Sequence, residues 1–299
     1  MPSFQQYWYV YALVIIAVID LAIGIKNYRK SHPTYPDFKV AMPDVKRIDV
    51  RYGFYASYGD QVNETKGFTN LHWESFYDSY EKGIENIRAF PDLVVCDFSR
   101  ALFGPRQADG MIPLNPDGAK NLVAMFNQLR DAGVLDKIKV AVLLDEPNLN
   151  TTRAEYEAAV LTFHTALLVT GVKMKLGVIY MGNNTEGTDY WAFNDHDIVG
   201  FDDYKRGNYI FAPGEEYERM RSILKPNQMM WLVPGSADTK GVKSIDPDTF
   251  EAVAHRDPWV WGVVAFLWAD VHGMAGVRSI PTQREKYIKI GYSLLWKTP

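Results

Sequence analysis

Cysteine is nearly absent from this chain of 299 residues, since Cys96 is the only one. A disulfide within the chain and a zinc site built on cysteines are therefore excluded. Runs of lysine and arginine are also missing, and 32 basic against 36 acidic residues give a net charge of −4. Since a basic patch ordinarily marks a nucleic-acid partner, we expect none.

Several motifs of catalysis and phosphate binding are absent as well. The sequence has no G-x-S-x-G turn, no H-E-x-x-H pair and no G-x-G-x-x-G loop after a strand, and Thr188 stands where a phosphate-binding loop starting at Gly182 would need lysine. The polar cluster at residues 194–197 could bind a cation, but a turn before a strand explains it better. We therefore expect no metal and no cofactor.

What the chain has in excess is aromatic side chains, at 14% of its residues, and a strongly apolar N-terminus. Residues 7–25 carry only one charge, Asp20, and as a helix they would span roughly 28 Å, close to a bilayer core. Aromatic residues begin this segment, and Lys26, Arg29 and Lys30 follow it, as at membrane interfaces. It predicts a single transmembrane helix in contact with the lipid bilayer. A cleaved signal peptide and a buried helix are the alternatives.

Asp20 is unusual in such a segment. A carboxylate near the middle of a bilayer costs on the order of 3 kcal/mol, so it usually faces protein or water. The sequence therefore suggests a transmembrane protein partner at Asp20, unless this residue lies within reach of the polar boundary.

The remaining chain divides into a linker and one large domain. We expect residues 1–30 to form the anchor and its basic flank, residues 31–43 a linker with three prolines, and residues 44–299 the folded domain. In this domain, short apolar runs alternate with amphipathic stretches, which is typical of βα units. The eight expected strands are residues 48–54, 68–73, 92–98, 138–145, 175–181, 197–202, 229–233 and 261–268.

Eight such strands in about 255 residues predict the α/β class and a (β/α)8 TIM-type barrel preceded by the transmembrane helix. A doubly wound open sheet is the alternative. The active site of a barrel lies at the carboxyl ends of its strands, so the polar residues that end each apolar run are the candidates. Glu146 directly follows the fourth run, where partial desolvation would raise its pKa and suit a general acid.

The sequence Asp145-Glu146-Pro147-Asn148 resembles the strand-four signature of the large clan of (β/α)8 retaining glycoside hydrolases. In that clan the motif is typically Asn-Glu-Pro and the glutamate is the acid/base, so the resemblance implies this role for Glu146 and a carbohydrate substrate. Trp268, after the eighth run, resembles the clan's sugar-stacking tryptophan. The chain departs from the pattern at strand seven, where the clan has a nucleophilic glutamate and this sequence reads WLVPGSAD.

Glycoside hydrolysis requires a second carboxyl group. Asp202 and Asp203 should point to opposite sides of the sixth strand, and we favour Asp203 because it lies nearer the rim. A salt bridge with Lys205 or Arg206 is the other interpretation. The predicted catalytic residues are Glu146, Asp203 and Asp270, and the predicted substrate-binding residues are Tyr55, Asp97, Tyr180, Trp191, Tyr204 and Trp268.

Two functions remain open. One is a membrane-anchored glycoside hydrolase-like barrel that acts on or binds a glycan. The other is a catalytically degenerate barrel that serves as an accessory or structural subunit of a membrane protein complex, which the missing strand-seven glutamate favours. An unrelated barrel enzyme is a third possibility. We expect a single-pass membrane protein with an extracytoplasmic domain, although the basic flank by itself indicates the cytoplasmic side.

Overall fold

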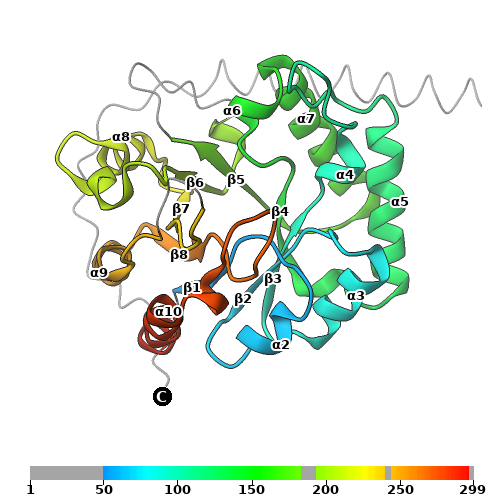
Figure 1. Cartoon of the computed structure of the whole chain (residues 1–299). Coiled ribbons are helices and arrows are strands. Elements are labelled where there is room, and N and C mark those ends of the chain that lie inside the picture. Colours follow the sequence, from blue (N-terminus) through cyan, green and yellow to red (C-terminus); the bar gives the residue numbers. More distant parts are fainter. Residues whose placement is uncertain (1–49, 183–192, 240–243, 296–299) are drawn as a thin grey trace, which may run out of the picture. The chain divides into compact units, whose positions relative to one another are not determined.

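The structure is a computed structural model that describes residues 50–182, 193–239 and 244–295. Eight strands form a single parallel sheet in the order β1-β8-β7-β6-β5-β4-β3-β2 (Figure 1). The strands are β1 (Arg51–Phe54), β2 (Leu71–Glu74), β3 (Leu93–Asp97), β4 (Ile138–Val142), β5 (Lys175–Met181), β6 (Ile198–Asp202), β7 (Met229–Val233) and β8 (Val260–Ala265). The first strand pairs with the last, with Tyr52 beside Val263, so the sheet curls into a barrel and the open doubly wound alternative is wrong.

The seam between β1 and β2 is bridged by one side chain. The Tyr52 backbone N–H donates to Asn70 Oδ1 at 2.7 Å, and the Asn70 N–H donates back to the Tyr52 carbonyl at 3.1 Å. The Asn70 amide nitrogen also donates to the Val50 carbonyl at 3.1 Å. An asparagine thus supplies the hydrogen bonds that a regular strand pair would make, because its side chain has both a donor and an acceptor. The predicted (β/α)8 TIM-type fold is confirmed.

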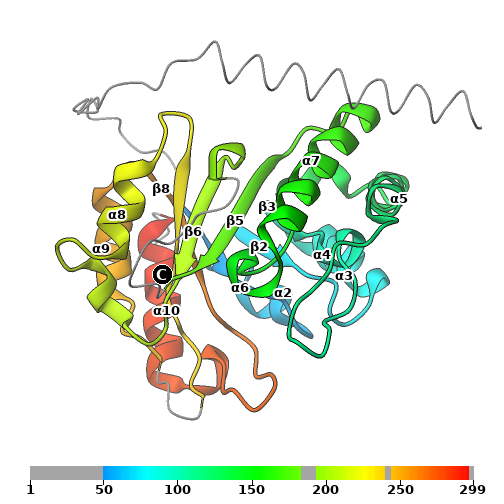
Figure 2. The same ribbon diagram turned by 90° about the horizontal axis from the view of Figure 1, so that it is seen from above.

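Helices surround the strands, as the two views at right angles show (Figures 1 and 2). Two of them, α3 and α7, begin at a side chain that caps the helix. Ser79 accepts from the Lys82 N–H at 3.0 Å, and Thr152 and Glu155 form a capping box. The α-helices are α2 (Gln61–Thr65), α3 (Tyr80–Ala89), α4 (Ser99–Leu102), α5 (Gly118–Asp131), α6 (Pro147–Asn150), α7 (Arg153–Thr170), α8 (Glu216–Ile223), α9 (Asp248–Arg256) and α10 (Pro281–Leu294), with 3₁₀ turns at Leu135–Lys137, Phe193–Asp195, Gly207–Phe211 and Val277–Ser279.

Strand alternation sorts the apolar residues into two layers. Outward-facing residues pack against the helices, and inward-facing ones fill the barrel. The largest inward side chains include Trp73 and Trp231, and the Trp231 indole N–H donates to the Val178 carbonyl at 2.8 Å. A Cβ atom added at Gly200 would lie 2.1 Å from this indole, so β6 needs glycine there. Side chains therefore fill the interior of the barrel at this level.

The predicted membrane location is corrected by the structure. Within the three described ranges, no helix combines the length and apolar character needed to cross a bilayer. The segment expected to do so, residues 7–25 with Asp20, lies outside these ranges, as does the linker at residues 31–43. Neither a membrane location nor a transmembrane partner enters the proposals below.

Candidate active site

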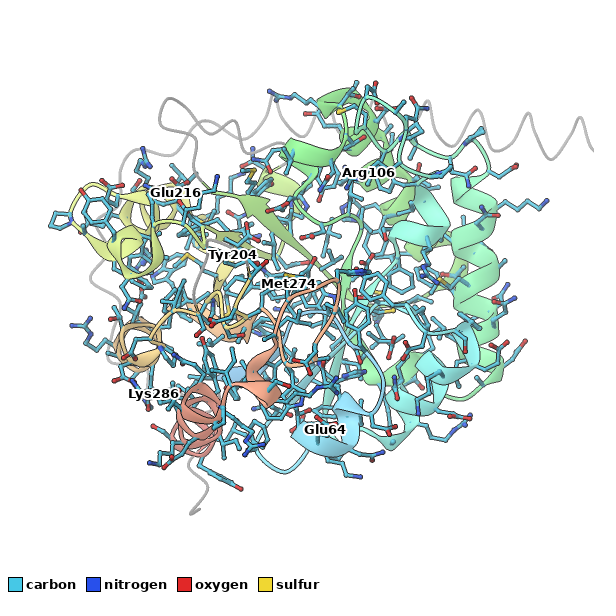
Figure 3. The ribbon with its side chains drawn as sticks, viewed as in Figure 1. Glu64, Arg106, Tyr204, Glu216, Met274 and Lys286 are labelled. Carbon is cyan, nitrogen blue, oxygen red and sulfur yellow. The ribbon has the colours of Figure 1, made fainter. Side chains whose placement is uncertain are left out.

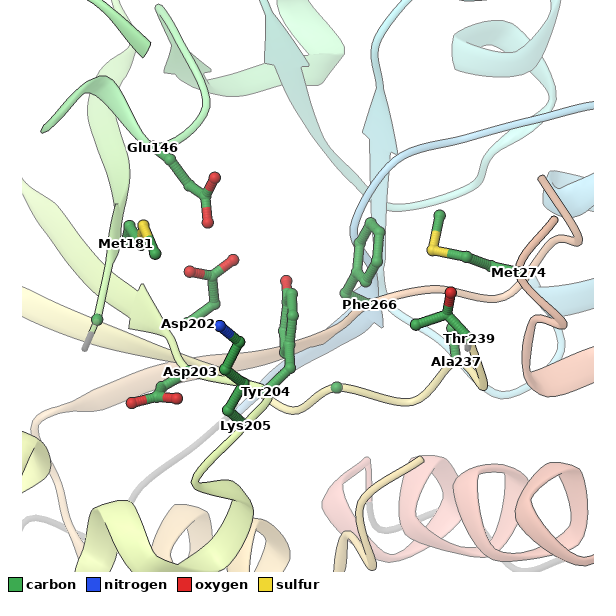
Figure 4. A pocket seen from close by; sticks show the side chains of 12 residues that line it. Glu146, Met181, Asp202, Asp203, Tyr204, Lys205, Ala237, Thr239, Phe266 and Met274 are labelled. Atoms are coloured by element: carbon green, nitrogen blue, oxygen red, sulfur yellow. The ribbon is translucent and has the colours of Figure 1, made fainter. Parts of the chain in front are cut away.

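A cavity of about 170 Å³ lies at the carboxyl ends of β4 to β8 (Figure 4). Side chains on its wall come from five consecutive strand ends. Figure 3 shows two of them, Tyr204 and Met274, near the centre of the barrel mouth, whereas Glu216 and Lys286 lie toward the periphery. The lining residues are Glu146, Met181, Gly182, Asp202, Asp203, Tyr204, Lys205, Gly235, Ala237, Thr239, Phe266 and Met274.

Glu146 enters this cavity from a distorted turn after β4. Its backbone N–H donates to the Ile179 carbonyl of β5 at 3.1 Å, which ties the turn to the barrel. Its φ of 43° is left-handed, a conformation that residues other than glycine rarely adopt. The next residue, Pro147, begins α6 and fixes the direction in which the chain leaves.

The same backbone conformation recurs around the mouth. Among the residues that the structure describes, four non-glycine residues have a positive φ: Ala56, Phe76, Glu146 and His272. They lie in the loops after β1, β2, β4 and β8, all at the carboxyl end of the barrel. Left-handed non-glycine residues cost free energy and tend to gather at functional sites. This end of the barrel therefore carries the features of a site, independently of the acidic residues.

Glu146 and Asp202 form a hydrogen-bonded carboxyl pair on the cavity wall. Figure 4 shows the two groups pointing toward each other. Asp202 is the last residue of β6 and faces inward, whereas Phe201 before it packs outward. Burial raises the pKa of Asp202 well above its usual range, and the negative charge of Glu146 adds to this shift. The hydrogen bond between them favours the protonated form of Asp202 and the ionised form of Glu146.

The pKa of Glu146 is also raised. Burial is the main cause, and the hydrogen bond from Asp202 and the positive charge of Arg106 oppose it in part. Arg106 is anchored nearby, since its guanidinium donates to Asn150 Oδ1 at 2.7 Å. The two carboxyl groups titrate as a unit. A pair of this kind can supply a proton at one step and accept it at another.

A third carboxyl group, Asp145, adjoins the pair. Burial raises its pKa to about 7, and the charge of Glu146 contributes. The Tyr55 hydroxyl interacts with Asp145, and this contact lowers the pKa of Asp145 in part. Asp97, at the end of β3, lies close enough to raise the pKa of Asp145 further and accepts a hydrogen bond from the Ser99 N–H at 2.7 Å. The mouth thus concentrates four acidic side chains with little solvent to stabilise their charges.

The structure places Asp203 differently from the expectation. Although it touches the cavity, its carboxylate forms an ion pair with Arg206 and accepts from the Arg206 N–H at 3.1 Å. Arg206 in turn contacts Glu215 at 2.7 Å and the fully buried Glu216 at 3.5 Å. Asp203 therefore stabilises the loop after β6, and Asp202 is the carboxylate that meets Glu146. The salt-bridge interpretation of Asp203 describes its contacts.

Asp270 is also engaged elsewhere. It accepts hydrogen bonds from the Gly276 N–H at 2.8 Å, Arg278 Nε at 3.0 Å and the Ser279 hydroxyl at 2.7 Å. Desolvation acts to raise the pKa of Asp270, but these hydrogen bonds and the Arg278 charge lower it overall. An ionised aspartate held by three donors stabilises the loop after β8 and is not brought to Glu146.

Of the predicted aromatic residues that the structure describes, Tyr55, Tyr180 and Trp268 do not line the cavity. Tyr180 faces the helices because it follows the inward-facing Ile179, and it packs edge-on against His196 at 6.3 Å between ring centroids. Trp268 packs against Phe54 at 5.0 Å, and its indole N–H donates to Glu64 at 2.5 Å. Neither Tyr180 nor Trp268 offers a free face to a sugar at the mouth. The predicted Trp191 lies outside the described residues.

Tyr204 does line the cavity, together with an aromatic residue that the sequence analysis did not select. Its ring stacks on Phe266, with centroids 5.3 Å apart and planes 14° from parallel. Phe266 follows β8, in phase with the inward-facing Val264, so strand alternation would have pointed to it. Alternation likewise selects Asp202 over Asp203. Position nearest the rim, the criterion that favoured Asp203, predicted the inward-facing carboxylate less well than strand alternation does.

Comparisons with known proteins find similar folds but no similar sequences. No protein-family model and no curated protein matches this chain. Among solved structures, the apo form of β-glucuronidase 3 from Bacteroides uniformis has 10% identity and a TM-score of 0.54 over 84% of this chain and 38% of its own. A β-glucuronidase from Faecalibacterium prausnitzii has 10% identity and a TM-score of 0.50 over 82% of this chain and 49% of its own.

An FMN-binding β-glucuronidase from strain L2-6 of the same species is similar, with 8% identity and a TM-score of 0.51 over 75% of this chain and 38% of its own. The chain thus spans less than half the length of these neighbours. At such identities the likeness concerns the fold alone. This chain has the eight-stranded parallel barrel also found in those glycoside hydrolases.

Proposed function

We propose that this barrel is a glycoside hydrolase-like protein that acts on a carbohydrate, with Glu146 as general acid/base and Asp202 as the second carboxylate. The observation that carries the proposal is the hydrogen-bonded Glu146–Asp202 pair on the wall of a cavity at the carboxyl ends of the strands. Catalytic groups of barrel enzymes lie at this end. The barrel likeness to β-glucuronidases is consistent with the proposal.

Cleavage of a glycosidic bond requires one group that protonates the leaving oxygen and another that attacks or activates water. In the pair, Asp202 carries a proton that Glu146 receives through their hydrogen bond. Glu146 is the less buried of the two and lies on a turn rather than in a strand, so it is placed to pass this proton to a substrate oxygen. Asp202 is then left as a carboxylate at the floor of the cavity.

The direct contact between the Glu146 and Asp202 carboxyl groups sets a requirement on substrate binding. Carboxyl groups lie about 5–5.5 Å apart in retaining glycosidases and about 6.5–9.5 Å apart in inverting ones. A direct hydrogen bond is shorter than either separation. Hydrolysis by this pair therefore requires a substrate that separates the carboxyl groups of Glu146 and Asp202 as it binds.

The test is hydrolysis of a panel of aryl and natural glycosides by the full-length chain and two isosteric variants, Glu146→Gln and Asp202→Asn. We expect each variant to lose at least about a hundredfold in kcat/KM, in line with the loss of a general acid or base. Glu157→Gln, at an exposed position of α7, is the matched control and should retain activity. Full activity in both cavity variants would contradict the proposal.

A second candidate function is glycan binding without hydrolysis. The observation that favours it is the end of β7, whose described continuation from Pro234 to Thr239 contributes no carboxylate to the cavity lining. In that case the panel would show no turnover by the wild-type chain. A glycan would still bind, and the same two variants would weaken its binding.

A further inference from the structure

The mouth of the barrel has two halves of different chemistry. The cavity occupies the half formed by β5 to β8, and the surface that its lining presents is mainly apolar. Beyond the acidic pair, Figure 4 shows this wall continuing past Tyr204 and Phe266 to Met274. Met181 and Ala237 complete it. The polar lining groups are grouped at the acidic end, apart from Thr239.

The aromatic part of this wall is fixed in place. A Cβ atom added at Gly235 would lie 2.7 Å from Tyr204, so the backbone after β7 supports this ring at contact distance. Phe266 stacks on the same ring, and the Tyr204 hydroxyl is hydrogen-bonded to Asp202. The two methionines at the ends of the cavity, Met181 beside the acidic pair and Met274 beyond Phe266, are flexible and adapt to ligands of different shape. A rigid aromatic wall flanked by adaptable thioethers suits a planar apolar group.

The other half of the mouth, at β1 to β4, is polar. Among the described residues, two buried polar atoms there have no hydrogen-bond partner, Ser57 Oγ and Trp73 Nε1, and the buried Tyr55 hydroxyl interacts with Asp145. Tyr55 and Trp73 are inward-facing neighbours, with ring centroids 4.5 Å apart. Buried polar groups are normally satisfied by protein, water or a ligand, so this half calls for hydrogen-bonding partners from outside the chain.

We propose that the cavity is an aglycone site, which takes the apolar, single-ring leaving group of a glycoside whose sugar lies toward the polar half of the mouth. This inference rests on the proposed function and names its substrate class. A sugar ring inside the cavity would exchange its hydrogen bonds with water for contacts with methionine, phenylalanine and alanine, at a net cost. An aromatic ring would gain by the same transfer.

The size and position of the cavity support the same orientation. An apolar cavity of about 150 Å³ is large enough to hold benzene, and this one measures about 170 Å³. Glu146, which follows β4, stands between the two halves and meets Asp202 of the cavity wall, and the bond between sugar and leaving group would lie there. An apolar group in the cavity would also exclude water from the pair, so the proton would stay available for the leaving oxygen.

The test compares phenyl and methyl glycosides of one sugar, chosen as the sugar that the wild-type chain hydrolyses best. Ala237→Leu fills the cavity, and Met274→Gln keeps its volume but makes its wall polar. For each substrate, the KM of a variant is compared with that of the wild type. The intrinsic difference in reactivity between the phenyl and methyl leaving groups therefore cancels. We expect each variant to raise KM at least tenfold for the phenyl glycoside and less than twofold for the methyl glycoside. Ala119→Leu, the same substitution at an exposed position of α5, should change neither.

Direct binding of phenol to the full-length chain, measured by calorimetry, gives a readout that does not depend on hydrolysis. The aglycone site is supported if phenol binds to the wild-type chain and to Glu146→Gln but not to Ala237→Leu. If phenol binds in this way and no glycoside is hydrolysed, only the hydrolytic function is contradicted. Hydrolysis with equal effects of the cavity variants on both glycosides overturns the aglycone site and leaves the hydrolytic function standing. Absence of both phenol binding and hydrolysis overturns both.

Discussion

Replacing Asp145 by asparagine should stabilise the protein, and more at high pH than at low pH. Burial, with the charge of Glu146 as the second cause, raises the pKa of Asp145 from 3.8 to about 7. The folded state therefore binds this proton more tightly than the unfolded state does. The stability that the bound proton provides is complete below pH 3.8 and is lost as the pH rises to about 7.

The magnitude follows from the two pKa values. With one pKa unit equal to about 1.4 kcal/mol, keeping Asp145 in the folded state costs at most about 4 kcal/mol at pH 8 and about 1.7 kcal/mol at pH 5. The Asp145→Asn side chain has nearly the same shape and no charge, so the variant escapes this cost. Its free energy of unfolding should exceed that of the wild type by these amounts, with a difference of about 2.5 kcal/mol between the two pH values.

The measurement is urea unfolding of the full-length chain at pH 5 and pH 8, followed by tryptophan fluorescence. Asp131→Asn, at an exposed position of α5, is the control for removing a negative charge and should behave alike at both pH values. An Asp145→Asn variant that gains the same stability at both pH values, or loses stability at pH 8, would refute the reasoning. A gain confined to high pH would also show that acidity at the mouth is maintained at the expense of stability.

Three further substitutions test the frame that holds the site. Gly200→Ala should cost at least about 3 kcal/mol in urea unfolding, because its Cβ would lie 2.1 Å from Trp231 in a filled barrel. Arg206→Ala should cost about 3 kcal/mol in the same assay, since it removes one of the two arginines that contact the buried Glu216. Thr152→Ala should lower the free energy of unfolding by about 1 kcal/mol in thermal denaturation, because α7 loses its cap.

The fold was predictable because its signal is repetitive. Eight apolar runs separated by amphipathic stretches report burial on both faces of a parallel sheet, and this pattern does not depend on where each strand ends. The strand ends themselves were less accurate. The fourth strand ends at Val142, three residues before the predicted end, and the eighth at Ala265. Trp268, expected at the mouth from its resemblance to the clan's tryptophan, lies three residues beyond the end of β8 and packs elsewhere.

The site was predictable only in part, because ion pairs between distant or irregular segments decide which carboxylate is free. Glu146 could be selected from the proline after it and the apolar run before it. The sequence offered Arg206 as a partner of Asp203, but only the loop geometry shows the ion pair together with the contacts to Glu215 and Glu216. The pKa shifts depend on burial in three dimensions, which no local pattern reports.

The register of the barrel shows how a carboxylate on β6 could replace the glutamate that is missing from the end of strand seven. Asp202 pairs in register with Val233, the last residue of β7. Adjacent strands lie about 4.8 Å apart, so an inward carboxylate at the end of β6 is one strand spacing away from a position at the end of β7. A hydrolytic pair could therefore use β4 and β6 in place of β4 and β7, at a shorter separation. This is consistent with the direct hydrogen bond between Glu146 and Asp202, and it makes the separation of their carboxyl groups on substrate binding the step on which catalysis would depend.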